Sequence, residues 1–125
     1  MNIQKLADFN RIYQAECFPD EINKMFGKST GEKKRYIKWL YTWLSILDSE
    51  GMSALNLEQF EHLKDTSNPS LYAIRHPHSM INERYIFIFA EEERSILLTA
   101  FKEKSTRNYH SAIKRANRIF KELEE

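Results

Sequence analysis

The sequence has a single cysteine, three glycines and three prolines among its 125 residues. One cysteine excludes an intramolecular disulfide and is typical of a reducing compartment. So few glycines and prolines argue against an extended disordered region. No apolar run approaches the roughly 18 residues that a bilayer-spanning helix needs, and Met1–Lys5 lacks the pattern of a secretory signal peptide. We therefore expect a cytoplasmic protein with no membrane partner.

Several kinds of catalytic site also lack their motifs. The chain has no glycine-rich phosphate loop and no Gly-x-Gly-x-x-Gly, so we expect no nucleotide cofactor. His76 and His78 lie close together, but no Cys or Asp neighbour completes a set of metal ligands, and we expect no metal. Cys17 has no accompanying pattern of a thiol nucleophile and is better explained as a small buried apolar residue.

Length and charge limit the remaining choices. A chain of 125 residues fits one domain, because two separate cores would each bury too little apolar area. The net charge of +1 and the pI near 7.8 are low for a dedicated nucleic-acid-binding domain, whose pI usually exceeds about 9. The charge is uneven, however, since Leu71–Lys121 holds ten Lys or Arg and five Glu. This excess fits a basic binding face or, equally, a solvated helix beside an acidic hairpin tip.

The first half of the chain predicts helices. Ser29-Thr-Gly-Glu32 has the form of a capping box, and apolar residues at helical spacing follow it as far as Leu47. Gly51 lies where such a helix would end. Asn56 can cap a second, shorter helix, in which Leu57, Phe60 and Leu63 follow together with the stems of Gln59 and Lys64. These two helices would form a helical hairpin.

The second half predicts strands followed by a helix. Leu71–Arg75, Arg84–Phe89 and Ser95–Lys104 are rich in β-branched and aromatic residues, and the polar segment 90–94 suits a hairpin tip. The amphipathic segment Tyr109–Leu123 predicts a last helix that begins at Asn108.

Residues 1–27 are ambiguous, since the segment 11–17 suits a strand, whereas Leu6, Phe9, Tyr13 and Cys17 also fit a helix. The expected fold is therefore α+β. A helical hairpin packs on a small antiparallel sheet of three to four strands, and a C-terminal helix closes the fold.

Cations and proton carriers gather at the predicted strand ends and at the start of the last helix: Arg84, Lys104, Arg107, Tyr109 and His110. Cleavage of RNA through its own 2′-hydroxyl needs a base, cations that stabilise the phosphorane, and an acid for the leaving 5′-oxygen. Arg and Lys supply charge without a metal, and Tyr or His can transfer protons. If the tips of these side chains converge, they predict a metal-independent ribonuclease. In the alternative, Tyr109 packs against the helix and the cations are solvated.

Four short motifs resemble the RelE/HigB-like toxins of bacterial toxin–antitoxin pairs, in the family's order. Leu71–Arg75 resembles the family's leucine-aromatic-x-leucine-arginine strand, and Arg84–Phe87 resembles its tyrosine-arginine-hydrophobic-aromatic strand. Ile96–Phe101 is similar to the family's aliphatic strand that ends in Phe. The start of the last helix is similar to the family's lysine-threonine-x-lysine segment followed by isoleucine and alanine, here Lys104–Arg107, Ile113 and Ala116.

The resemblance implies a single toxin domain over residues 1–125 with a RelE-like fold. It also implies a ribosome-dependent mRNA endoribonuclease that acts without metal or cofactor and is silenced by a cognate antitoxin. Carried over by position, Arg84 holds the scissile phosphate, Lys104 stabilises the transition state, and Tyr109 or His110 transfers the proton. The expected substrate-binding residues are Arg75, Lys102 and Arg107.

The chain departs from the family's pattern at Glu103, Leu71 and Ala73, where lysines are common. These departures leave an alternative open, a non-catalytic RNA- or protein-binding module of the same fold. A gyrase-directed inhibitor of the ParE type is a further alternative.

Overall fold

A six-stranded mixed sheet forms the middle layer of the computed structural model, which describes residues 1–124. The sheet order is β1-β2-β6-β5-β4-β3, in which β2 runs parallel to β6 and the other neighbours are antiparallel. The strands are β1 (Ile3–Lys5), β2 (Ile12–Ala15), β3 (Phe60–His62), β4 (Tyr72–Arg75), β5 (Glu83–Phe89) and β6 (Ser95–Lys102). The short 3-10 helices are η1 (Gly51–Asn56) and η2 (Glu91–Glu93).

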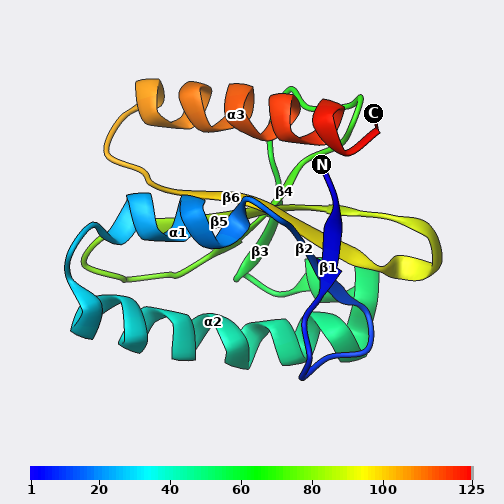
Figure 1. Ribbon diagram of the computed structural model, residues 1–125, viewed down its shortest axis with the longest axis horizontal. Helices are drawn as coiled ribbons and strands as arrows, with labels where there is room; N and C mark the ends of the chain where they lie inside the picture. The colour runs from blue at the N-terminus through cyan, green and yellow to red at the C-terminus, as the bar shows by residue number, and fades with distance from the viewer. Residues whose placement is uncertain (125) are drawn as a thin grey trace.

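Within residues 1–124, three α-helices surround this sheet (Figure 1). They are α1 (Phe18–Phe26), α2 (Thr30–Glu50) and α3 (Thr106–Glu124). Helix α3 covers one face of the sheet and α2 covers the other, while α1 runs beside β6 (Figure 1). Because β2 pairs with only the first part of β6, α1 takes the place of a neighbouring strand along the rest of β6. None of the helices within residues 1–124 has both the length and the apolar character that crossing a bilayer requires.

The α+β class is correct, but two expectations about its parts are wrong. The sheet has six strands where three to four were expected, and the parallel β2–β6 pair makes it mixed. The segment expected to form the second helix of a hairpin, which begins after the expected cap Asn56, instead contains β3, and Asn56 itself is the last residue of η1. Phe60 packs on the α2 side of the sheet and Leu63 on the α3 side, so their apolar character reflects two cores.

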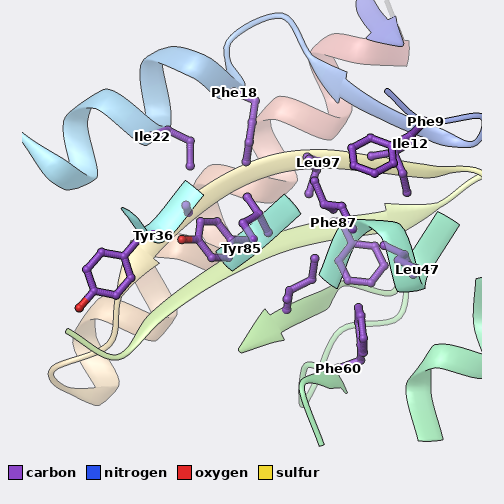
Figure 2. Close-up of a cluster of buried hydrophobic side chains, with 14 of the residues drawn as sticks. Phe9, Ile12, Phe18, Ile22, Tyr36, Leu47, Phe60, Tyr85, Phe87 and Leu97 are labelled. Atoms are coloured by element: carbon purple, nitrogen blue, oxygen red, sulfur yellow. The ribbon is translucent and has the colours of Figure 1, made fainter. Parts of the chain in front are cut away.

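Both faces of the sheet are buried, as the continuous apolar run of β5 predicts. Tyr85 and Phe87 point to the core under α2, whereas Ile86 and Ile88 point to the core under α3. The α2 core also contains the predicted apolar stripe of that helix, from Tyr36 to Leu47 (Figure 2). Burial of a large apolar side chain contributes roughly 1.5–3 kcal/mol, so this stripe is a main source of stability.

The boundaries of the helices have identifiable causes. Helix α2 ends as predicted before Gly51, whose φ of 58° suits glycine and whose N–H donates to Leu47 O. A Cβ on Gly51 would also lie 2.7 Å from a carboxylate oxygen of Glu93. Helix α3 begins before the predicted cap Asn108, because Ser105 Oγ accepts from Asn108 N at 3.4 Å.

The ambiguous segment 1–27 contains two strands and a helix. The strand interpretation of residues 11–17 is confirmed by β2, which pairs with β6. The first strand, β1, pairs with β2 at the edge of the sheet, and the Met1 amino group donates to Glu122 O at 2.9 Å. The N-terminus therefore lies beside the end of α3 (Figure 1).

Candidate functional site

A cleft of about 440 Å³ lies between β3, β5 and the start of α3. It contains two of the four predicted catalytic residues, Arg84 and Tyr109. Its other lining residues are Glu61, His62, Leu63, Lys64, Glu103 and Thr106. Because Ile86 on β5 faces the core under α3, alternation along the strand places Arg84 on that same face.

Two carboxylates hold the guanidinium of Arg84. Its Nη1 pairs with Glu61 Oε1, and its Nη2 lies 2.6 Å from Glu103 Oε2. The Arg84 side chain is 15% exposed, so these ion pairs are only partly screened by water. Lys64 is the other cation that lines the cleft. The positive and negative charges of the cleft are thus balanced, and a phosphate must displace a carboxylate to reach Arg84.

Arg75 lies directly opposite Arg84 in the β4–β5 pair. Opposite residues of an antiparallel pair point to the same face, so both arginines lie on the α3 side. Within residues 1–124, the buried Nε atoms of both have no hydrogen-bond partner. This arrangement leaves two buried donors beside the cleft.

Tyr109 and His110 lie at the start of α3, with ring centroids 5.6 Å apart. The Tyr109 hydroxyl donates to Lys64 O at 3.1 Å. Burial, together with the negative charges of Glu61 and Glu103, raises the pKa of the Tyr109 phenol. The phenol therefore stays protonated at neutral pH and is a weaker acid than an unperturbed tyrosine, but it can still protonate an alkoxide, whose conjugate acid is weaker still. His110 is exposed and does not line the cleft.

The predicted lysines lie elsewhere. Lys102 and Lys104 line a second groove, between α1, β6 and α3, and Lys102 Nζ also lies 3.6 Å from Glu32 Oε1 of α2. Arg107 is exposed on the first turn of α3 and lines neither hollow. The structure therefore brings Arg84 and Tyr109 together, and separately Lys102 and Lys104.

The cleft also contains residues that sequence reasoning missed, above all Glu61 and Lys64. Both belong to a segment that was expected to be helical, and Glu61 reaches Arg84 only because β3 pairs with β4. No spacing in the sequence connects Glu61 with Arg84, which are 23 residues apart. Glu103, a departure from the toxin pattern, is the second partner of Arg84.

A separate polar cluster surrounds Glu83, whose side chain is fully buried. Glu83 Oε2 lies 2.6 Å from His76 Nδ1, and the carboxylate also accepts from the hydroxyls of Ser79 and Tyr85. The His76 ring stacks on Trp39 with centroids 3.6 Å apart. Burial and the charge of Glu83 raise the pKa of the Tyr85 phenol. These contacts fix the loop between β4 and β5. No group of three or more His, Cys, Asp or Glu in the described part of the chain is placed to hold a metal ion.

The sequence profile of the family described as phage-derived protein Gp49-like (DUF891) matches residues 46–121. The chain belongs to the Gp49-like family. The matched segment runs from the end of α2 into α3 and includes every residue of the Arg84 cleft. The Gp49-like family is a toxin-type family of the RelE/ParE superfamily type, in agreement with the toxin resemblance of the strands. No curated protein matches the chain.

Proposed function

We propose that this Gp49-like protein is the toxin of a toxin–antitoxin pair and that it cleaves mRNA on the ribosome without a metal. The toxin character of the family supports the first part. One observation carries the second part: Arg84, which can bind a phosphate, and Tyr109, which can donate a proton, line the same cleft as a carboxylate. A cognate antitoxin that covers this surface is part of the proposal.

The proposed reaction uses the RNA's own 2′-hydroxyl as the nucleophile. The Glu61 carboxylate takes the proton of that hydroxyl, and the freed oxygen attacks phosphorus. Arg84 neutralises the charge that develops on the phosphorane oxygens. Tyr109 gives its proton to the 5′-oxygen as the phosphorus–oxygen bond breaks. The products are a 2′,3′-cyclic phosphate and a free 5′-hydroxyl.

The other predicted residues have supporting roles in this proposal. Lys104 adds positive charge from the neighbouring groove. His110, exposed to solvent next to Tyr109, returns through water the proton that Tyr109 loses. Arg75 lies beside Arg84 and adds to the positive potential at the scissile phosphate.

The balanced charge of the cleft favours one alternative, a non-catalytic binding module of the same fold. Glu61 and Glu103 already occupy the guanidinium of Arg84. A protein target such as gyrase could be bound by the same mixed-charge surface without any cleavage of RNA. The two functions differ in which macromolecule is damaged.

Inducible expression separates these functions. We expect wild-type protein to arrest growth with cleaved mRNA and intact chromosomal DNA. Arg84→Ala should relieve the arrest, because loss of a preorganised charge contact lowers a rate by about 10²-fold or more. Arg35→Ala is the matched control, since Arg35 is exposed on α2. Circular dichroism of both variants checks that they are folded. If Arg84→Ala does not fold, Arg84→Lys, which retains the positive charge, replaces it in the assay. DNA breaks without mRNA cleavage would contradict the proposal.

A further inference from the structure

The second groove, between α1 and α3, has a volume of about 470 Å³ and a strongly basic lining. Five cations line it: Lys24, Lys102, Lys104, Arg115 and Arg118. We infer that this groove binds the phosphodiester backbone of RNA without reading its bases, at a site separate from the Arg84 cleft.

Among the described residues, one acidic residue, Glu21, lines the groove, and its side chain is only 9% exposed. Its carboxylate is already engaged by Thr99 Oγ1 at 2.6 Å, by Arg115 Nε at 3.3 Å and by Lys24 Nζ at 3.5 Å. Within residues 1–124, Lys104 and Arg118 form no ion pair. The groove thus keeps an excess of positive charge, unlike the balanced Arg84 cleft.

The hydrogen-bonding groups of the groove favour a phosphate over a peptide. Besides the cations, Ser111 and Asn108 face it, and the Ala100 carbonyl already accepts from Arg115 Nη2 at 3.3 Å. The Glu21 oxygens are taken as described above. A peptide would bring N–H donors that find few free acceptors here, whereas a phosphodiester brings acceptors only.

The groove also lacks an exposed ring on which a base could stack. Its one aromatic residue, Phe101, is 5% exposed and belongs to the core under α3. Sequence-tolerant stacking on aromatic side chains is a common way to hold bases of single strands. Its absence from this lining limits recognition to the backbone.

The position of the groove connects it with the cleft. Lys104 and Asn108 line the groove, whereas Thr106 and Tyr109 line the cleft, so the first turn of α3 separates the two. A strand held in the groove would be led across this turn towards Arg84. The use of the groove in cleavage rests on the proposed function, but the binding itself can be measured without cleavage.

The test is fluorescence anisotropy of the full chain with a labelled 2′-O-methyl RNA 12-mer, which cannot be cleaved through its 2′-position. Lys24→Gln with Arg118→Gln removes one exposed cation from each wall of the groove. We expect about tenfold or more weaker binding and a slope of log Kobs against log salt that is smaller in magnitude by about 1.4, since each single-strand phosphate contact contributes about 0.7. Lys38→Gln with Lys121→Gln is the matched control, because both residues are exposed helical lysines outside the groove. The control should change the affinity less than twofold.

Three results would overturn the inference: unchanged binding of the groove variant, an equal loss in the control variant, or tighter binding of oligoglutamate than of RNA at equal charge and equal salt. The last result would assign the groove to an acidic protein segment. A DNA 12-mer of the same sequence should bind with the same affinity as the RNA, because the groove contacts only the backbone. Binding of the RNA but not of the DNA would contradict this. Groove-dependent binding by a protein that cleaves no mRNA would refute the nuclease and retain the groove. Cleavage of mRNA by a protein whose RNA binding does not depend on the groove would retain the nuclease and refute the groove.

Discussion

Replacement of Glu103 by Gln should raise the rate of RNA cleavage, because Glu103 occupies the Nη2 of Arg84 that a phosphate needs. Arg84 Nη2 lies 2.6 Å from Glu103 Oε2, and the Arg84 and Glu103 side chains are 15% and 24% exposed. A hydrogen bond to a charged group contributes about 1.5–3 kcal/mol. A phosphate that binds Arg84 must first break this contact with Glu103. If the variant removes most of the free energy needed to break it, kcat/KM should rise roughly 10- to 100-fold, at 1.36 kcal/mol for each factor of ten.

The assay is cleavage of a reporter mRNA in a translation extract, with the melting temperature of each protein measured alongside. The backbone contacts of Glu103 with Asn82 do not use the carboxylate, so the variant should fold normally. Glu91→Gln, at the exposed hairpin tip, gives the same change in charge outside the cleft. A Glu103→Gln protein that melts like wild type and cleaves no faster would refute the assignment of Arg84 to the phosphate.

Three further predictions concern the cleft and the Glu83 cluster. Tyr109→Phe keeps the ring but removes the proposed acid, so cleavage should fall about 10²-fold or more while Tm changes little; equal cleavage would exclude Tyr109 as the acid. Glu83→Ala leaves His76 and Tyr85 without their buried acceptor and should lower the free energy of unfolding in urea by about 3–5 kcal/mol. The pKa of Tyr85 is raised in the folded state, so the unfolded chain releases this proton at a lower pH than the folded protein does. The contribution of Tyr85 to stability is therefore fully present below pH 10 and is lost as the pH rises further. Tyr85→Phe should therefore flatten the fall of Tm between pH 9 and 11, and an equally steep fall in that variant would contradict this cause.

Much of the fold could be predicted because the signals are local. The three strands of the second half and both long helices are found close to their predicted positions, since each has its own periodicity and boundary residues. The short strands β1 and β3 have three residues each, too few for a period to be detected. The parallel pairing of β2 with β6 joins residues more than 80 positions apart and has no local signature.

The candidate site was harder to predict because charge balance depends on pairing. The sequence identified Arg84 and Tyr109, which share the cleft, but it grouped them with Lys104, which lies in the other groove. Glu61 could not be placed beside Arg84 without knowing that β3 pairs with β4 and β4 with β5. An excess of cations along a segment therefore predicts a basic surface but not which of its cations remain unpaired.

The most direct test of the central claim is to map the 5′ ends of a translated mRNA by primer extension after brief induction of the protein. From the central claim we expect new ends inside the translated region for wild type, loss of these ends in Arg84→Ala, and loss of them when the start codon of the reporter is removed. Growth arrest by wild type with no new 5′ ends in any translated mRNA would contradict it.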